Sequence, residues 1–331
     1  MTLNNVWFVA IAVLWVGYFV LEGFDFGVGM LLPVLARNDT ERRVMINTIG
    51  PVWDGNEVWL ITAGGATFAA FPEWYASLFS GFYLALLLIL VALILRGVAF
   101  EYRAKRDSQR WRAGWDRAIV FGSVVPAVLW GVAFGNIVRG VKLNARHDYV
   151  GTFWDLLNPY ALLGGLVTLT LFATHGAIFL ALKTRDEIRQ RAVGLALKTG
   201  VVAAVLAVIF LVWTQFHGGD AVTAVLAGVA ALAFVCALVL SYKGREGWAF
   251  GLSAFAIGMA VISLFAVLYP NVLPSTLNPA YSLTVVNAAS TPKTLGIMTW
   301  VAVIFLPLVL LYQAWTYWVF RRRIGVRDIP A

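Results

Sequence analysis

Cysteine, histidine and charged residues are all scarce in this sequence of 331 residues. The single cysteine, Cys236, lies alone in an apolar run, so the chain has neither a disulfide framework nor a cysteine-based metal motif. The three histidines are far apart and include no His-x-x-x-His pair. We therefore predict no metal site in this chain and no haem held between two of its histidines.

The low charge content also excludes an ordinary soluble domain. Charged residues make up 13% of the chain and hydrophobic residues 61%, whereas soluble domains contain about 25% charged residues. The formal net charge of +8 could indicate a nucleic-acid partner, but the basic residues are confined to short connections between apolar runs. We therefore predict a protein that is embedded in a lipid membrane and has no nucleic-acid partner.

Apolar runs long enough to cross a bilayer occur nine times. A transmembrane helix needs about 20 mainly apolar residues, and runs of this length without period-2 alternation indicate helices and not barrel strands. We therefore expect an all-α polytopic membrane protein that forms a single integral membrane domain over residues 1–331. The predicted spans are 6–35, 48–69, 77–100, 116–138, 158–182, 199–217, 220–241, 248–269 and 295–320.

The distribution of Lys and Arg predicts how these spans are oriented. Twenty of the 25 basic residues fall in the connections on one side, four on the other, and Arg96 lies within a predicted span. Because basic residues concentrate on the cytoplasmic side, we expect the N-terminus outside and the C-terminus in the cytoplasm. The connection over residues 270–294, rich in Pro and Asn, is expected to cover the outer face.

Ionisable side chains within the predicted spans mark the candidate site. Only four of the 17 acidic residues lie there at depth, namely Glu22 and Asp25 in the first span and Asp54 and Glu57 in the second. Each pair is spaced i, i+3 and so shares one helix face. Charges at membrane depth are costly and by default indicate ion paths, ligand sites or partner contacts.

These acids are expected near the cytoplasmic face. Asp25 precedes Arg37, and Asp54 follows Arg43, by so few residues that each acid lies at most roughly 16–18 Å along the chain from that Arg. Arg96 is also near the cytoplasmic end of its span. We therefore expect Asp25, Asp54, Glu57 and Arg96 in one layer, with Glu22 slightly deeper.

Structural roles are open for several of these residues. Gly50-Pro51 looks like a helix start with Pro at the first position, where Asp54 would only complement the helix dipole. Arg96 could extend to the interface with its head group in water. His175 is expected to be a packing histidine.

Protonatable groups that begin near the cytoplasmic face meet the needs of a proton relay. Burial and nearby charges together adjust how readily such groups exchange protons. The alternative is a proton-coupled secondary transporter that uses Glu22/Asp25 and Asp54/Glu57 as its coupling site. Transporters usually show inverted repeats and broken helices, and neither is evident in this sequence. A purely structural role in interhelical contacts is a third reading.

A series of segments recurs in one known family, in the same order along the whole chain. On these segments the chain resembles subunit II of the cytochrome bd quinol oxidases, which oxidise ubiquinol or menaquinol. The segments are residues 23–30 (GFDFGVGM), 37–43 (RNDTERR), 53–65 (WDGNEVWLITAGG), 79–83 (FSGFY), 131–136 (GVAFGN), 157–160 (LNPY) and 298–303 (MTWVAV).

The resemblance implies a fold of two four-helix bundles plus one peripheral helix, in the plasma (inner) membrane of a bacterium. It implies a haem-free subunit that binds no cofactor by itself and scaffolds a partner, subunit I. Subunit I would hold two haems b and one haem d and would bind quinol. The complex would oxidise quinol and reduce dioxygen to water with protons from the cytoplasm. The family also allows a structural quinone in subunit II and small single-helix accessory subunits.

The resemblance also implies roles for residues of the second span. Asp54 matches the acid of the Trp-Asp-Gly-Asn motif, the expected cytoplasmic entry of a proton path that continues into subunit I. Trp53, Asn56 and Trp59 match flanking motif positions, which are expected to line the path or the interface.

Three further residues belong to the expected proton path and its electrostatics. Asp25 matches the family's first-helix Asp, and Arg96 matches an Arg within the third span. Glu57 is a departure, because some members have Gln at this position. A second titratable group therefore lies next to Asp54 in this chain, and the route of the relay is left open.

Overall fold

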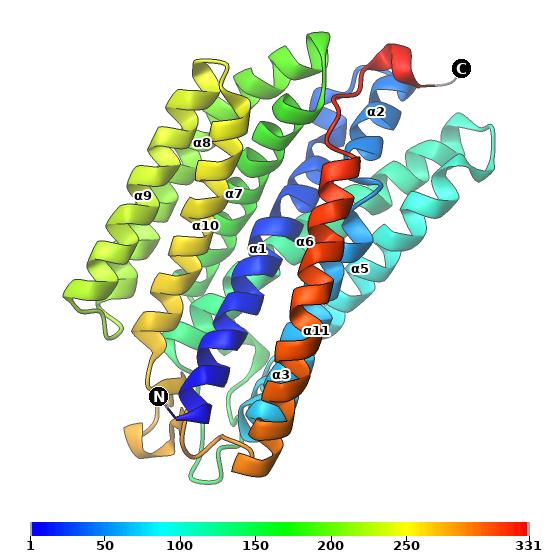
Figure 1. The fold of residues 1–331 in the computed structure, drawn as a ribbon. Coiled ribbons are helices and arrows are strands. Elements are labelled where there is room, and N and C mark those ends of the chain that lie inside the picture. Colours follow the sequence, from blue (N-terminus) through cyan, green and yellow to red (C-terminus); the bar gives the residue numbers. More distant parts are fainter. Residues whose placement is uncertain (1, 330–331) are drawn as a thin grey trace.

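The computed structural model describes residues 2–329 and is almost entirely helical (Figure 1). The α-helices that it describes are α1 (Leu3–Leu35), α2 (Asp39–Ile49), α3 (Trp53–Ala70), α4 (Pro72–Gly81), α5 (Tyr83–Tyr102), α6 (Gln109–Arg139), α7 (Pro159–Lys183), α8 (Asp186–Gln215), α9 (Ala221–Tyr242), α10 (Glu246–Leu268) and α11 (Pro292–Val319).

Eight helices among the described residues are long and apolar enough to cross a membrane. They are α1, α5 to α10 and α11, so the prediction of an all-α polytopic membrane protein is confirmed. Helix α3, which corresponds to the second predicted span, is not among them. Its first two turns contain Asp54, Asn56 and Glu57, which lower the hydropathy of this short helix. The ninth span stays a prediction.

Local boundaries differ from the sequence-based ones in several places, and α6 and α8 begin at Gln109 and Asp186, well before the predicted spans 116–138 and 199–217. The connection after α1 is itself a helix, α2, whose N-cap Asn38 accepts a hydrogen bond from the Glu41 amide. Gly50 then caps the end of α2 and Pro51 lies in a turn, so the predicted helix start with Pro at the first position is wrong; α3 begins at Trp53. The predicted span 77–100 is divided at Phe82 into α4 and α5.

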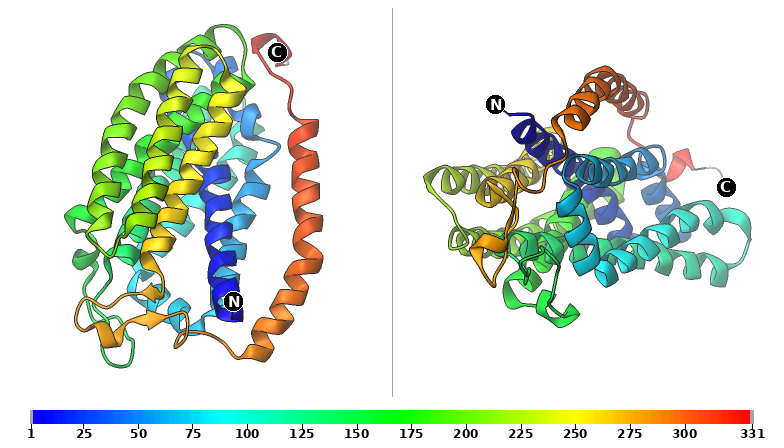
Figure 2. Two further views of the ribbon diagram at one scale, coloured as in Figure 1. Left: turned by 60° about the vertical axis from the view of Figure 1, so that its left-hand side comes forward. Right: turned by 90° about the horizontal axis from the view of Figure 1, so that it is seen from below.

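The helices pack in two groups with one outlier. Helix α1 packs against α3 and α6, and α6 against α5, while α7 to α10 pack on one another. Helices α1 and α6 contact α7, which joins the groups. Helix α11 lies outside against α1 and α3, as the view from below in Figure 2 makes clear. Leu295 is the only buried residue of α11.

Small residues let α1 approach its neighbours closely. A Cβ atom placed on Gly27 would lie 2.6 Å from Cα of Gly176 on α7, so both positions require glycine. Close backbone approach at small residues is the usual way in which membrane helices gain packing energy. Helix α1 is thereby held at the centre of the molecule, and Glu22 and Asp25 are fully buried there.

The two ends of the helix bundle differ. The N-terminus lies at the lower end in Figure 1 and the C-terminal segment at the upper end. At the lower end, strands β1 (Asn271–Leu273) and β2 (Leu283–Thr284) pair antiparallel. The amide of Val141 donates to the carbonyl of Pro274 over 2.9 Å, so the segment over residues 270–294 covers that end of α6. At the upper end the amide of Ile324 donates to the carbonyl of Lys183 over 2.9 Å.

Candidate functional site

A buried cluster of charged side chains lies where α1, α3 and α5 meet. Arg96 from α5 forms ion pairs with Glu22 of α1 and with Glu57 of α3, the latter with 2.6 Å between Nη2 and Oε1. The side chains of Arg96 and Glu22 have no exposed surface, whereas that of Glu57 is 21% exposed. Within residues 2–329 the cluster therefore reaches the surface only through Glu57.

The surroundings of Arg96 hold its guanidinium inside the bundle. The guanidinium carbon lies 4.6 Å from the ring centroid of Phe26 and 5.9 Å from that of Phe100, distances at which an aromatic face attracts a cation. Gly122 of α6 leaves room for the Arg96 backbone, since a Cβ there would lie 2.5 Å from Arg96 Cβ. The alternative that Arg96 extends to the interface is wrong, because its side chain is paired and fully buried.

In the second part of the site, Asp25 is surrounded by uncharged polar side chains. Asn56 of α3 donates an amide hydrogen to Asp25 Oδ2 over 2.6 Å, and both residues are fully buried. The Asn56 carbonyl oxygen accepts from the Tyr317 hydroxyl over 2.8 Å and from the Gln313 amide over 3.3 Å. Gln313 in turn accepts from the Trp59 indole over 2.9 Å. The peripheral helix α11 thus contributes two polar side chains to the site.

Several buried polar atoms of this site have no hydrogen-bond partner among residues 2–329. They are Glu22 Oε2, Asp25 Oδ1, and Nε and Nη1 of Arg96. Buried polar groups are normally paired with protein or with ordered water. Water would bind at any of these atoms, whereas a transferred proton would bind only at the two carboxyl oxygens, because a guanidinium has no acceptor.

The motif residues Trp53 and Asp54 lie at the edge of this site. Asp54 is exposed in the first turn of α3, and no ion pair or side-chain hydrogen bond joins it to another residue of the described chain. The ring of Trp53 packs against Phe100, with 5.1 Å between centroids. Among the predicted site residues, Asp25, Asn56, Glu57, Trp59 and Arg96 are brought together, while Asp54 stands apart on the surface.

Two residues of the site and one pairing were not predicted. Glu22 was recognised as a buried acid, but its pairing with Arg96 was not foreseen. Gln313 and Tyr317 come from α11, more than 250 residues after Asn56 in the chain. The available signal was polar groups within the last apolar run, and nothing in the sequence indicates which earlier span they face.

The histidine within the bundle has a structural environment. His175 Nδ1 lies 2.7 Å from the Ser253 hydroxyl, Nε2 lies 3.2 Å from the carbonyl oxygen of Val20, and the ring stacks on Phe250. Both ring nitrogens are thus partnered, as expected of a packing histidine. Within residues 2–329 no three His, Cys, Asp or Glu residues are grouped so that they could hold a metal ion.

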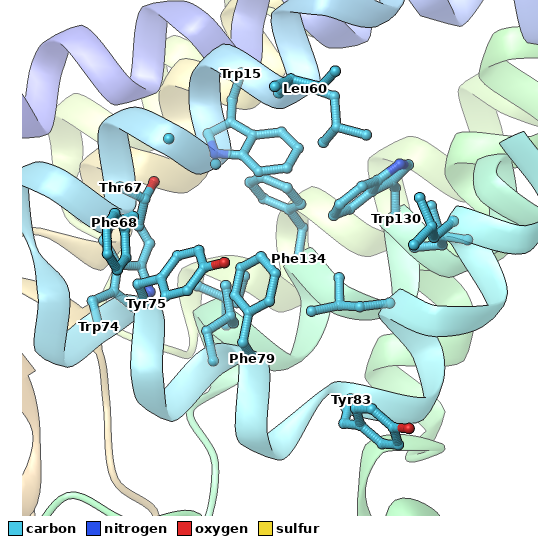
Figure 3. A pocket seen from close by; sticks show the side chains of 18 of the residues that line it. Trp15, Leu60, Thr67, Phe68, Trp74, Tyr75, Phe79, Tyr83, Trp130 and Phe134 are labelled. Atoms are coloured by element: carbon cyan, nitrogen blue, oxygen red, sulfur yellow. The ribbon is translucent and has the colours of Figure 1, made fainter. Parts of the chain in front are cut away.

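An apolar cavity of about 590 Å³ lies beside the candidate site, lined mainly by α3, α4, α5 and α6. Trp74, whose indole nitrogen has no partner among the described residues, is part of its lining. Figure 3 shows the cavity edged by the rings of Trp15, Phe68, Tyr75, Phe79, Trp130 and Phe134. Its size and lining suit a large apolar molecule.

Comparisons with known proteins agree along the whole chain. Residues 3–320 match the family model of cytochrome bd terminal oxidase subunit II. The chain is 43% identical to cytochrome bd ubiquinol oxidase subunit 2 of Bacillus subtilis (strain 168), over 99% of this chain and 98% of that protein. It is 40% identical to cytochrome bd-I ubiquinol oxidase subunit 2 of Escherichia coli (strain K12), over 99% and 96%.

A solved structure has the same fold. A chain in the structure of bd oxidase from Geobacillus thermodenitrificans matches with a TM-score of 0.79 at 19% identity. The match covers 97% of this chain and 99% of that one.

Proposed function

This chain belongs to the cytochrome bd terminal oxidase subunit II family, and we propose that it is the haem-free subunit of a quinol oxidase that conducts protons to its partner. The relatives are subunits of cytochrome bd ubiquinol oxidase. The chain is accordingly a component of a quinol:oxygen oxidoreductase. Subunit I holds the two haems b and the haem d in this proposal, binds quinol and reduces dioxygen to water.

The chain forms one integral domain of nine spans in the plasma membrane of a bacterium, with α3 as the ninth. Helices α1, α3, α5 and α6 make one bundle, α7 to α10 the other, and α11 is peripheral. Termini at opposite ends of the structure fit an odd number of crossings. The excess of Lys and Arg in the connections at the C-terminal end fits a cytoplasmic C-terminus. Small accessory helices can join the complex at exposed helix faces.

The proton path begins at Asp54 and proceeds inward. Asp54 is exposed, Glu57 is partly exposed, and Arg96 and Glu22 are buried behind Glu57. Asp25 is buried on the same face of α1 as Glu22, one turn nearer the C-terminal end of that helix. Groups of this kind, placed in order of increasing burial, can pass a proton from the cytoplasm to the interior, and Trp53, Asn56 and Trp59 enclose the route.

One observation carries the proposal: three buried or partly buried carboxyl groups lie in the site with a single guanidinium. Glu22 and Glu57 both pair with Arg96, and Asp25 has no basic partner among the described residues. A net charge within a membrane is costly, so a neutral cluster requires protons on two of the three carboxyl groups. The cluster therefore holds exchangeable protons where a relay needs them.

The entry role of Asp54 is tested by Asp54→Asn in the intact complex, with quinol-driven oxygen consumption as the readout. We expect slower turnover and an unchanged haem spectrum. The matched control is Glu101→Gln, an exposed acid of α5 near the same end. Unchanged turnover in Asp54→Asn would leave Asp54 with only a role in complementing the helix dipole.

The haem-free claim is tested by isolating this chain, which should show no Soret absorbance.

The apolar cavity is proposed as the place of a structural quinone. Its volume and aromatic lining suit a quinone ring with an isoprenoid tail, and the Trp74 indole, which has no partner among the described residues, can donate to a quinone carbonyl oxygen. Gly65→Phe should fill the cavity, because a side chain at Gly65 meets no neighbouring atom. We expect this variant to lose co-purified quinone and the control Gly228→Phe, on the exposed face of α9, to keep it. Equal quinone in both would exclude this place.

The alternative of a proton-coupled secondary transporter is less well supported. Membership of an oxidase family along residues 3–320 favours the subunit role. Asp54 and Glu57 also lie in the first two turns of α3, whereas a transporter's coupling site is expected near the bilayer midplane.

A further inference from the structure

A chain of hydrogen bonds runs from a motif tryptophan to the buried acid of α1. Trp59 Nε1 lies 2.9 Å from Gln313 Oε1, and Gln313 Nε2 lies 3.3 Å from Asn56 Oδ1. Asn56 Nδ2 lies 2.6 Å from Asp25 Oδ2. This series of hydrogen bonds runs from α3 to α11, returns to α3 and ends on α1. The peripheral helix is therefore a necessary link between two residues of the inner helices.

The Trp59 indole fixes the donor and the acceptor of every hydrogen bond in this series. An indole N–H can only donate, so Gln313 must turn its carbonyl oxygen toward Trp59. Its NH2 group then faces Asn56, which must present its own carbonyl oxygen. The NH2 group of Asn56 is left for Asp25. Trp59 thus determines the orientation of two amide side chains and the group that Asp25 meets.

A second donor reinforces this orientation. The Tyr317 hydroxyl lies 2.8 Å from the same Asn56 Oδ1 and donates to it. Both lone pairs of that oxygen are then used, and Asn56 is fully buried. Rotating the Asn56 amide by half a turn would place its NH2 group against two donors and its oxygen against the Asp25 carboxyl.

The consequence concerns the two oxygens of Asp25. Oδ2 accepts the Asn56 N–H whether or not the carboxyl is protonated, and a protonated Oδ2 would place its hydrogen against that N–H. Oδ1 is buried and has no partner among the described residues. We propose that Trp59, Gln313 and Asn56 are positioning residues that make Asp25 take and release its proton at Oδ1. This inference rests on the proposed proton path, of which Asp25 is a member.

The decisive variant is Gln313→Glu. A carboxylate can only accept hydrogen bonds, so it would accept from Trp59 and from the Asn56 NH2 group, and Asn56 would turn its oxygen toward Asp25. Asp25 would then have to donate from Oδ2, and its C=O group, now at Oδ1, would lose its hydrogen bond. The carboxyl C=O stretch of Asp25 should consequently move to higher wavenumber.

The measurement is infrared difference spectroscopy on the intact complex over a range of pH. Selective ¹³C labelling of aspartate separates the Asp25 band from that of the introduced Glu, and its loss in Asp25→Asn assigns it. Trp59→Phe, which retains the ring, is a milder second variant and should split or broaden the band because both amide orientations become allowed. Trp315→Phe, an exposed position of α11, is the control and should leave the band unchanged.

A band that neither shifts in Gln313→Glu nor splits or broadens in Trp59→Phe would overturn the inference, as would the absence of an Asp25 band at every pH. The proposed proton path has a separate readout. If Asp25→Asn retains full oxygen consumption, the path through Asp25 fails even when the band shifts as expected.

Discussion

Arg96 and Glu57 are joined by an ion pair of 2.6 Å between α5 and α3, and the same guanidinium also holds Glu22 of α1. One buried cation thus fixes three helices relative to one another. Helix α1 is the central member, because it also packs against α6 and α7. The arrangement of the bundle and the charge balance of the candidate proton path therefore depend on the same side chain.

Removing the guanidinium should destabilise the protein strongly. Arg96→Met leaves Glu22 and Glu57 without their cation, and breaking a buried pair in this way costs about 3–5 kcal/mol. We expect a lower thermal unfolding temperature for the detergent-solubilised complex and partial recovery when Glu22→Gln is added. Arg110→Met, at an exposed position that forms no ion pair in the described chain, is the control. Equal stability of both single variants would contradict the role of Arg96.

The packing of α6 against Arg96 should not tolerate even one methyl group. A Cβ at Gly122 would lie 2.5 Å from Arg96 Cβ and 2.6 Å from the Ala92 carbonyl oxygen. Gly122→Ala should cost about 1–3 kcal/mol through overpacking and should slow turnover by displacing Arg96. On the same helix, Gly114 has no atom near such a Cβ, and Gly114→Ala should be neutral or slightly stabilising. Stability is measured by thermal unfolding, and similar values for the two variants would exclude a tight contact.

The loop after α6 should have a distinctive acid titration. The Lys142 ammonium, 2.7 Å from Oδ1, together with hydrogen bonds from Thr152, lowers the pKa of Asp155 to about 2. A lowered pKa means that these contacts add stability above the unfolded-chain pKa of about 3.9, and that this stability is lost as the pH falls through about 2. A ¹³C titration of the carboxyl should show a midpoint near 2.

Lys142→Met should raise that midpoint toward the unfolded-chain value, because the largest cause of the shift is removed. Lys293→Met, an exposed lysine elsewhere among the connections, should leave it unchanged. If the midpoint is the same with and without Lys142, the ion pair does not control Asp155.

The sequence indicates which charged residues belong to the site, but it does not indicate which of them pair, because pairing depends on how the helices pack. Glu22, Asp25, Glu57 and Arg96 could be recognised because ionisable groups are rare in apolar runs. Their pairing could not be predicted, because Glu22 and Asp25 lie one turn apart on the same face of α1 and either could have faced Arg96. The rotation of α1 and α5 about their axes places Glu22 against Arg96.

The contribution of Gln313 and Tyr317 from α11 could not be predicted either, because it also depends on how the helices pack. The Gln313 side chain could equally well have faced lipid, another helix or a partner subunit. Its contact with Asn56 depends on where the last helix docks. Helix α2 was missed because its polar sequence resembles an ordinary connection, although Asn38 is a good N-cap.

The central claim is that the buried carboxyl groups around Arg96 deliver protons to the partner subunit, and Glu22→Gln tests it most directly. This variant retains the size and hydrogen-bonding capacity of the side chain but cannot release a proton. Proton uptake from the cytoplasmic side should be measured together with quinol-driven oxygen consumption by the complex in liposomes. We predict that both fall on the order of 10²-fold, with the haem spectrum unchanged. Proton uptake and turnover at the full rate in this variant would contradict the account.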